Sequence, residues 1–357
     1  MFSKNVISID IGTQSIDVVV GKKVKNFYII DDAFTIPTPP NCFSDGRLTN
    51  IEALAELIKQ YILEKDIKAR DLIFTLSSSG IITREIVLPA KKSENLESMI
   101  NFEISQYLPV DLSQYIVEYK YLEEFEEDGV KKSRILVAAV QKSIVDGYYE
   151  LANQLDLNPV AMDISSNAIA KLMLDPTAVN EEPFNSLDTI VTIDIGNASI
   201  NITILNEGKI GLSRIITQGS SAIDKCIADK LKIPIIEAEK IKLEELDLDP
   251  EAELSPSGVK QLESIEYTVN EWMRDIERII RFYESRNADK KVGTVFIYGG
   301  GSNMKGLAKF MQKSMNIPIY SLNIVNNIKL DDKIKDLNLR QYFNAIGAIP
   351  NRKQVWL

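Results

Sequence analysis

The sequence contains no histidine and only two cysteines, Cys42 and Cys226, which lie far apart in the chain. The absence of histidine excludes serine–histidine–aspartate catalysis, cysteine–histidine catalysis and every zinc site that needs an imidazole ligand. The two cysteines belong to no motif with metal-ligand spacing, so we expect them to be reduced thiols of a cytoplasmic protein.

Long apolar runs and an excess of positive charge are also missing. No apolar stretch approaches the roughly 20 residues that a membrane-spanning helix needs, and Asp10 interrupts the apolar stretch in which a signal peptide would be sought. The net charge of −10 argues against a broad nucleic-acid surface and against direct binding to anionic lipid. We therefore expect a chain that binds no nucleic acid and does not itself insert into a membrane.

What the 357 residues do contain is one stretch that occurs twice. Residues 6–20 read VISIDIGTQSIDVVV, residues 190–204 read IVTIDIGNASINITI, and Asp10 aligns with Asp194 when the two are superposed. Each copy predicts an apolar strand, a tight glycine-containing turn and a second apolar strand. The chain therefore contains a duplicated unit rather than a short tandem repeat.

Each copy of the repeat also carries a pattern suited to phosphate. Its first strand ends in an aspartate two residues before a glycine, with Asp10 before Gly12 and Asp194 before Gly196. Such a turn can direct backbone N–H groups and one carboxylate at a phosphate and its metal ion. The repeat therefore indicates a phosphate site.

A glycine-rich segment, GGGSNMKGL, covers residues 299–307 and follows a strand predicted over 292–298. It is not a P-loop, because Leu307 stands where that motif needs lysine, and it lacks the spacing of a dinucleotide-binding turn. What remains is a glycine turn whose backbone a flat base or a phosphate can approach closely. Taken alone, the segment is equally compatible with an ordinary tight strand-to-helix turn.

The region between the two copies predicts a further unit. Residues 85–159 follow the order strand, helix, strand, strand, helix, which indicates a small α+β subdomain inserted into a larger one. An acidic run in it, EEFEEDG, predicts an exposed hairpin tip. Elsewhere the apolar spacing predicts a strand pair over 27–36, a strand pair after 315, and helices over 93–108, 159–174, 235–246 and 265–283.

Taken in order, these motifs resemble those of the actin-like ATPase superfamily, which includes actin, sugar kinases and heat-shock chaperones. Five motifs of the superfamily can be placed along the chain. They are a first phosphate hairpin at 10–17, a first connecting helix at 159–170, a second phosphate hairpin at 194–201, an adenosine motif at 298–307 and a second connecting helix at 344–350. The resemblance implies an α/β fold of two ribonuclease-H-like domains that binds ATP or ADP with Mg²⁺. The implied units are a first domain of 1–84, 160–188 and 344–357, the inserted subdomain of 85–159, and a second domain of 189–343 that is helical near 225–290.

The inserted subdomain narrows the resemblance to the FtsA-like branch of the superfamily. The stretches 101–119 and 137–164 are similar to the PilM family of type IV pilus assembly proteins, whereas the short NRKQVWL end is unlike the amphipathic membrane helix of FtsA. The resemblance implies a cytoplasmic adaptor that binds the N-terminal tail of the inner-membrane protein PilN in a groove beside the inserted subdomain. It also implies recruitment to the inner face of the membrane through that partner, and a link to the assembly motor. The candidate groove residues are Phe102, Ile104, Tyr107 and Leu108.

The resemblance further implies roles for single residues. Asp10 and Asp194 would hold Mg²⁺ through water, and Asp163 would orient the attacking water or act as its base. Glu239 and Lys242 would touch the ribose. The implied phosphate-binding residues are Gly12, Thr13, Gln14, Ser15, Gly196, Asn197, Ala198 and Ser199, and the nucleoside would be lined by Gly299, Gly300, Gly301 and Ser302.

One position departs from the superfamily pattern. Asp17 stands where the first hairpin often carries a lysine, and an acid about 4 Å from a phosphate costs a few kcal/mol at an effective dielectric constant of about 20. Efficient ATP hydrolysis is therefore in doubt: either another lysine or arginine compensates and weak ATPase activity remains, or the chain binds nucleotide weakly and acts as a structural adaptor. An FtsA-like filament-forming ATPase, a small-molecule kinase of the same fold and self-association into oligomers are the alternatives.

Overall fold

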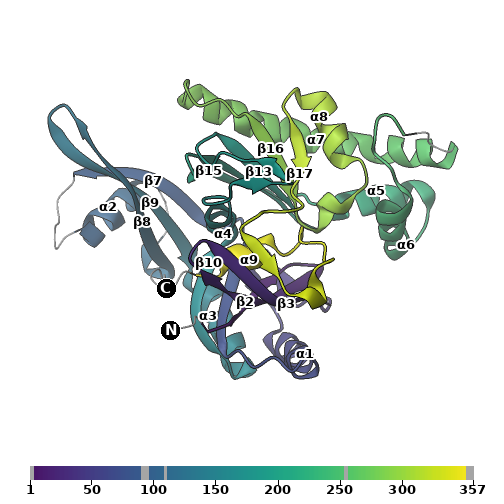
Figure 1. Ribbon diagram of the computed structural model, residues 1–357, viewed down its shortest axis with the longest axis horizontal. Helices are drawn as coiled ribbons and strands as arrows, with labels where there is room; N and C mark the ends of the chain where they lie inside the picture. The colour runs from purple at the N-terminus through teal and green to yellow at the C-terminus, as the bar shows by residue number, and fades with distance from the viewer. Residues whose placement is uncertain (1–3, 90–95, 108–110, 253–255, 351–357) are drawn as a thin grey trace.

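The computed structural model describes residues 4–89, 96–107, 111–252 and 256–350. Two large sheets form the centres of the two halves of the molecule, and a smaller third sheet lies to one side of both (Figure 1). This is the mixed α/β architecture that the duplicated hairpins and the insertion predict.

The first sheet has six strands in the order β10-β6-β1-β2-β3-β18. Strands β1, β2 and β3 form an antiparallel meander, while β6 and β10 run parallel to β1. The bounds are β1 Val6–Ile11, β2 Ser15–Val24, β3 Phe27–Pro37, β6 Asp71–Leu76, β10 Asn158–Ile164 and β18 Ile328–Leu330.

Side-chain alternation in β1 sets the direction of its aspartate. Ile7, Ile9 and Ile11 pack in one core cluster with α1 (Ile51–Glu64) and α3 (Lys142–Leu155). Because neighbouring residues of a strand point to opposite faces, Ser8 and Asp10 face the other side of the sheet, toward the second half of the molecule. The apolar pattern of β1 therefore positions a candidate site residue.

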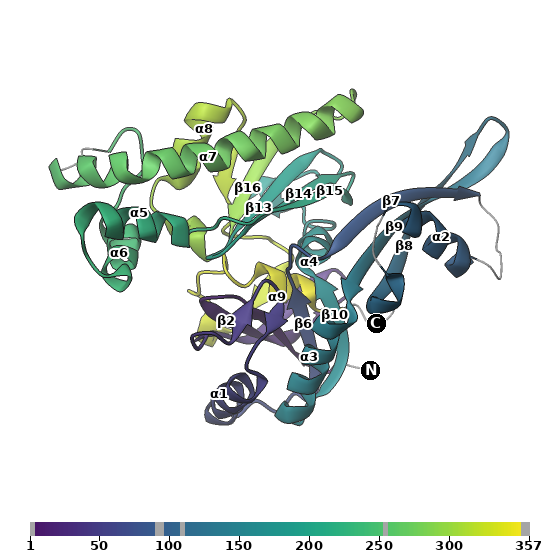
Figure 2. The same ribbon diagram turned by 180° about the vertical axis from the view of Figure 1, so that it is seen from behind.

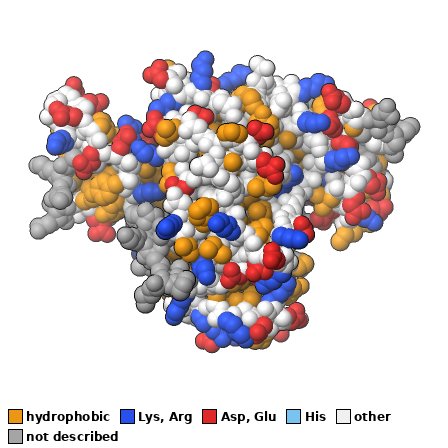
Figure 3. Space-filling model, viewed as in Figure 1, with side chains coloured by type: hydrophobic (Ala, Val, Ile, Leu, Met, Phe, Trp, Pro, Cys, Tyr) orange, Lys and Arg blue, Asp and Glu red, His pale blue; other side chains and the backbone are white. Residues whose placement is uncertain are grey.

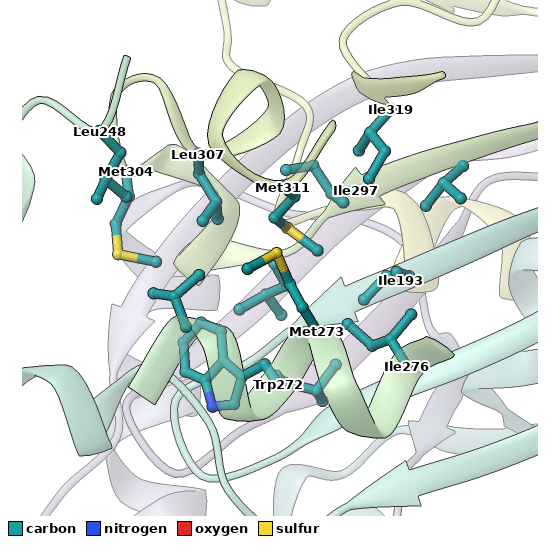
Figure 4. Close-up of a cluster of buried hydrophobic side chains, with 14 of the residues drawn as sticks. Ile193, Leu248, Trp272, Met273, Ile276, Ile297, Met304, Leu307, Met311 and Ile319 are labelled. Carbon is teal, nitrogen blue, oxygen red and sulfur yellow. The ribbon is translucent and has the colours of Figure 1, made fainter. Parts of the chain in front are cut away.

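The second sheet has five strands in the order β15-β14-β13-β16-β17. Trp272 and Ile276 of the long helix α7 pack against Ile193 and Ile297 of this sheet (Figure 4), which confirms that the apolar stripe of α7 belongs to the core. The bounds are β13 Ile190–Ile195, β14 Ile200–Asn206, β15 Lys209–Ile216, β16 Thr294–Tyr298, β17 Ile319–Ser321, α5 Ser221–Leu231, α6 Ile235–Lys240, α7 Pro256–Arg286 and α8 Leu307–Met315.

Two short helices lie between the sheets. Helices α4 (Ser165–Leu172) and α9 (Phe343–Ala348) contribute to a core cluster that also takes residues from both sheets. A side chain at Gly347 would collide with the backbone of Ala168, so the absence of a side chain there allows the two helices to cross closely. The crossing joins the halves at the level where the two hairpins end.

The inserted subdomain is an antiparallel sheet in the order β7-β9-β8 with one helix packed on it. Its elements are β7 Ile82–Pro89, α2 Leu96–Tyr107, β8 Tyr115–Glu127 and β9 Val130–Gln141. Carboxylates gather on the projecting end of the β8–β9 hairpin, so the predicted exposed acidic tip is confirmed (Figure 3). Helix α3, predicted as the last element of the insertion, instead packs on α1 beneath the first sheet.

Several predicted elements are wrong in type or extent. The stretch 27–36 is one strand, and the predicted helix 159–174 is β10 followed by α4, because pairing with β6 overrides a helix-compatible apolar spacing. The strands β17 and β18 do not form a pair, since β17 joins the second sheet and β18 pairs with β3 of the first. The chain therefore returns to the first half by Ile328, within the range predicted for the second domain.

Two predicted stretches extend beyond the residues that the structure describes. They are residues 93–95 and 108 of the predicted helix 93–108, and residues 351–357 of the predicted first domain.

Short elements complete the fold. They are β4 Phe43–Ser44, β5 Arg47–Leu48, β11 Ala178–Val179, β12 Glu182–Pro183, 3-10 turns at Leu112–Gln114, Gly300–Asn303 and Asp332–Ile334, and a π-helical turn at Ile241–Glu245. None of the helices in the described ranges is long and apolar enough to cross a membrane.

Candidate functional site

The two copies of the repeated stretch fold into the same turn. The Gly12 N–H donates to the Ser15 carbonyl oxygen at 2.8 Å, and the Gly196 N–H donates to the Ser199 carbonyl oxygen at 2.9 Å. Both glycine N–H groups are therefore used inside their own turns. Of the other predicted phosphate-binding residues, Thr13, Gln14, Asn197 and Ala198 lie at the turn tips, while Ser15 and Ser199 close the turns through their carbonyl oxygens.

The two turn tips contact each other across the space between the halves. The Thr13 hydroxyl donates to Asn197 Oδ1 at 3.1 Å, and Asn197 Nδ2 donates to Gln14 Oε1 at 3.1 Å. The Gln14 side-chain amide also donates to the carboxylate of Glu239 on α6. The structure thus brings together Thr13, Gln14, Asn197 and Glu239, and their side chains bridge the place where a phosphate chain would lie.

Behind the tips, one amide links the two aspartates of the repeat. Asn344 Nδ2 donates to Asp10 Oδ2 at 3.1 Å and to Asp194 Oδ2 at 2.9 Å. The Tyr298 hydroxyl donates to Asn344 Oδ1 at 2.9 Å, which fixes the orientation of that amide. Asn344 is the second residue of α9 and was not predicted as a site residue; a polar residue at the head of the apolar stretch NAIGAIP was the available signal.

Asp17 completes a cluster of three carboxylates. It lies directly opposite Asp10 in the β1–β2 pairing and is only 7% exposed. The Thr35 hydroxyl donates to its Oδ1 at 2.7 Å, and the Ser15 hydroxyl donates to its Oδ2 at 3.1 Å. Like charges placed directly opposite each other on neighbouring strands repel, so this cluster carries electrostatic strain.

The second hairpin avoids that strain. Asn201 takes the position opposite Asp194 and donates to its carboxylate at 3.3 Å. The Ser77 hydroxyl, which follows β6 in the first half, donates to Asn201 Oδ1 at 2.8 Å. The two hairpins therefore have the same backbone conformation, but the first carries a second carboxylate where the second carries an amide.

The pKa values of the three carboxylates are all raised, because the groups are buried and the part of the chain that the structure describes places no positive charge beside them. Burial, together with the charges of Asp194 and Asp17, raises the pKa of Asp10 to about 8 against the opposing hydrogen bond from Asn344. Burial raises the pKa of Asp17 to about 7 and that of Asp194 to about 6. No lysine or arginine of the described ranges forms an ion pair with any of the three. The cluster is therefore a place where a proton or a cation is favoured.

The donor set at this place fits a magnesium ion that is bound together with phosphate. Among the residues that the structure describes, no group of three or more acidic or cysteine side chains is arranged to hold a metal ion on its own. Mg²⁺ commonly takes one or two carboxylates and completes its shell with water and phosphate oxygens. Asp10 and Asp194, brought together by Asn344, provide such a pair.

The glycine turn after β16 packs closely on the second hairpin. Gly299 has φ +84°, and a side chain there would collide with Asp194 Oδ1, while one at Gly301 would lie 2.6 Å from Ile195 Cγ2. Ser302 is buried and donates from its hydroxyl to the Gly299 carbonyl oxygen at 2.7 Å. Only Gly300 has open space at its Cα, so it is the member of the predicted nucleoside-binding set whose backbone a ligand can approach.

Asp163 lies apart from the carboxylate cluster. It ends β10 opposite Thr75 of β6, which in turn lies opposite Asp10, so two strand spacings of about 4.8 Å each separate the aspartates. Its carboxylate forms an ion pair with Lys171 Nζ at 2.7 Å and accepts a hydrogen bond from Asn167 Nδ2 at 2.7 Å. The structure therefore gives Asp163 a role in anchoring the start of α4 and does not bring it into contact with Asp10.

Glu239 and Lys242 do not share one helix face. The predicted helix 235–246 is α6 followed by the π-helical turn Ile241–Glu245, which contains Lys242. Lys242 is 2% exposed and its Nζ pairs with Asp224 Oδ1 at 2.8 Å. The ammonium group implied for ribose binding thus points inward, whereas Glu239 reaches the tip of the first hairpin.

An apolar groove lies between the inserted subdomain and the first sheet. It has a volume of about 260 Å³ and contains the buried Tyr148, whose hydroxyl has no hydrogen-bond partner in the described part of the chain. Phe102, a predicted groove residue, is exposed on α2, and Ile104 is buried against the inserted sheet. Leu108 and the side chain of Tyr107 lie outside the described residues. The lining includes Ile116, Tyr119, Ala138, Val140, Val145 and Met162.

Comparisons with known proteins agree over most of the chain. Residues 8–348 match the family model of type IV pilus assembly protein PilM. Cell division protein FtsA of Neisseria meningitidis serogroup B is 22% identical over 263 residues, which cover 66% of this chain and 60% of FtsA. The alignment therefore spans less than two thirds of that relative.

Solved structures show the same fold at low sequence identity. The PilM-PilN type IV pilus biogenesis complex matches with a TM-score of 0.79 at 20% identity, over 96% of this chain and 97% of that one. The ethanolamine utilization protein EutJ of Carboxydothermus hydrogenoformans matches with a TM-score of 0.58 at 12% identity, over 98% and 90%. MreB5 of Spiroplasma citri bound to AMPPNP matches with a TM-score of 0.51 at 13% identity, over 97% and 95%. The predicted actin-like fold is confirmed.

Proposed function

The chain belongs to the PilM family of type IV pilus assembly proteins, and we propose that it is a nucleotide-binding adaptor which holds the N-terminal tail of a PilN-type inner-membrane protein. The observation that carries the proposal is the family match over residues 8–348 together with the apolar groove beside the inserted subdomain. The adaptor works in the cytoplasm, is recruited to the inner face of the membrane by that tail, and links it to the assembly motor.

The groove suits an extended peptide. Strand β8 is the outer strand of the inserted sheet and β10 is the outer strand of the first sheet, and both border the groove. Outer strands present unpaired N–H and C=O groups, to which a peptide can add as a further strand. Apolar side chains of the tail would occupy the pocket floor.

The nucleotide would lie at the carboxylate cluster, on the other side of α4 from the groove. Asp10 and Asp194 would hold Mg²⁺, the tip residues Thr13, Gln14, Asn197 and Ala198 would contact phosphate, and the open backbone at Gly300 would face the nucleoside. When bound, Mg²⁺ supplies positive charge to the phosphates and to the buried acids. The side-chain bridge between the two tips opens to admit the phosphates.

Turnover is expected to be weak in this adaptor. Asp17 adds a buried negative charge beside Asp10, where the phosphate charge would already be concentrated. Asp163, the candidate base, is held by Lys171 and Asn167 away from the cluster. Nucleotide would thus act mainly as a ligand that sets the relation between the two halves.

A peptide titration tests the adaptor function. Fluorescence anisotropy with the labelled PilN N-terminal tail should give saturable binding, and Ile116→Glu, which puts a charge into the groove, should weaken it about tenfold or more. Tyr121→Glu is the matched control, because Tyr121 lies on the same strand outside the groove. Absence of binding by the parent at high micromolar peptide would reject the proposal.

A further inference from the structure

A second, larger cleft lies on the same face of the inserted sheet as the apolar groove, and Leu136 of β9 lines both. It has a volume of about 1050 Å³ and is walled by β7 of the insertion, by β15 and by the end of α7. Figures 1 and 2 show β7 beside β15, with the inserted sheet set off from both large sheets. Nothing in the proposed adaptor function uses this space.

Two walls of this cleft are strand edges. Strand β7 is an outer strand of the order β7-β9-β8, and β15 is an outer strand of the order β15-β14-β13-β16-β17. Seven consecutive residues of β15, 209–215, line the cleft. Because side chains alternate between the two faces of a strand, such a continuous run means that the backbone edge itself faces the space. Unpaired N–H and C=O groups along this edge are therefore available to another chain.

The cleft is positively charged in a protein that is negatively charged overall. Its walls carry six cationic and only three acidic side chains, while the whole chain has a net charge of −10. Within the described part of the chain, Arg214, Arg286 and Lys290 form no ion pair with a carboxylate. The cationic residues are Arg84, Arg134, Lys209, Arg214, Arg286 and Lys290.

The cleft already contains carboxylates that are presented from strands. Glu85 of β7 pairs with Arg134 Nη1 at 2.5 Å, and Glu123 of β8 pairs with Arg134 Nε at 2.9 Å and with Lys209 Nζ at 3.5 Å. These pairs show how an acid on an extended strand meets the cations of the cleft. They leave Arg214 of β15, Arg286 at the end of α7 and Lys290 in the turn that follows α7 for an added strand.

We propose that this cleft binds an extended acidic segment of a partner protein, which pairs its main chain with the edge of β15 and directs its carboxylates at Arg214, Arg286 and Lys290. A strand edge is a feature that recognises a polypeptide, because neither a nucleic acid nor a lipid headgroup can continue the ladder of a sheet. The three cations come from β15, from the end of α7 and from the turn after it, which suits several separate carboxylates of one extended segment. The three acids in the walls disfavour a polyphosphate.

A synthetic peptide that alternates glutamate and valine is the probe. Anisotropy titration of its fluorescein-labelled form at low ionic strength should give saturable binding to the parent, and a lysine–valine peptide of equal length should not bind. The double variant Arg214→Glu, Lys290→Glu should lose about tenfold or more in affinity. The double variant Arg274→Glu, Arg278→Glu makes the same charge change at exposed positions of α7 outside the cleft, and should bind as the parent does.

Further measurements distinguish an extended acidic peptide from other ligands of the cleft. A glutamate–valine peptide that is N-methylated at alternate residues keeps its charge but cannot pair as a strand, and it should bind at least about tenfold more weakly. Equal binding of the methylated peptide, equal loss in both double variants, or tighter cleft-dependent binding of inorganic polyphosphate or a single-stranded oligonucleotide would each overturn the proposal. Failure of this proposal is distinguishable from failure of the adaptor function, because Ile116 lines only the apolar groove and Arg214 and Lys290 line only this cleft.

Discussion

Replacing Asp17 by asparagine would test the electrostatics of the first hairpin, because the second hairpin already carries Asn201 at the equivalent position. Asparagine has nearly the same shape and removes the charge opposite Asp10. Its carbonyl oxygen can accept from the Thr35 hydroxyl, and the Ser15 hydroxyl can turn to accept from its amide. The substitution thus changes charge with little change in packing.

The size of the effect follows from the pKa of Asp17. Burial raises this pKa from 3.8 to about 7, so the folded state keeps its proton through a pH range in which the unfolded state has lost it. The folded state binds more protons there, and the parent therefore loses stability as the pH rises from about 4 through about 7. At about 1.4 kcal/mol per pKa unit, the loss is on the order of 4 kcal/mol. The variant has no such group, and it also removes one of the charges that raise the pKa of Asp10.

Urea unfolding followed by far-ultraviolet circular dichroism, at pH 5 and at pH 8, measures this effect. We expect the free energy of unfolding of Asp17→Asn to exceed that of the parent by about 3 kcal/mol more at pH 8 than at pH 5, because about two of the roughly three pH units between the unfolded and folded pKa values lie above pH 5. Glu56→Gln, which removes an exposed acid on α1, is the control and should follow the parent at both pH values. A difference between Asp17→Asn and the parent that is the same at both pH values would refute the reasoning.

Other substitutions test the remaining parts of the site. Asn344→Ala leaves Asp10 and Asp194 without their shared donor and should lower the free energy of unfolding by about 2–3 kcal/mol, more at pH 8 than at pH 5; a smaller loss at pH 8 would contradict it. Gly299→Ala should cost several kcal/mol in thermal unfolding, whereas Gly300→Ala should cost about 1 kcal/mol or less, and equal costs would show that the turn is not packed as described. Asp194→Ala should remove the Mg²⁺-dependent part of ATP binding in calorimetry, and an unchanged Mg²⁺ dependence would remove Asp194 from the metal site.

The parts of the site that the sequence predicts are those encoded locally. The repeated stretch specifies strand, turn and strand within a few residues, so Gly12 and Gly196 adopt the same turn. The glycine turn after β16 was likewise visible, since the close approach to Asp194 tolerates no side chain at Gly299. Because these features depend only on neighbouring residues, they could be predicted without knowledge of the rest of the fold.

The parts that the sequence does not predict depend on distant partners. The apolar spacing of residues 159–174 fits a helix, and only the pairing of β10 with β6 makes its first half a strand. Lys242 fits the exposed face of a regular helix, but a π-helical turn and Asp224 draw it inside. Asn344 is an ordinary amide until the crossing of α9 places it between two aspartates that lie far away in the sequence.

The return of the chain to its first sheet also determines the order in which the two halves can fold during synthesis. The first half is completed by β18 at Ile328–Leu330 and by α9 at Phe343–Ala348, which come from the last part of the chain. The strands of the second sheet lie within 190–321 and can pair as that stretch leaves the ribosome. Until β18 and α9 emerge, the edge of β3 and the face of β1 that carries Asp10 are uncovered. Nascent chains of this protein therefore carry an open sheet edge until residues 328–348 have emerged, and this is the interval in which a chaperone or a mispaired strand would meet it.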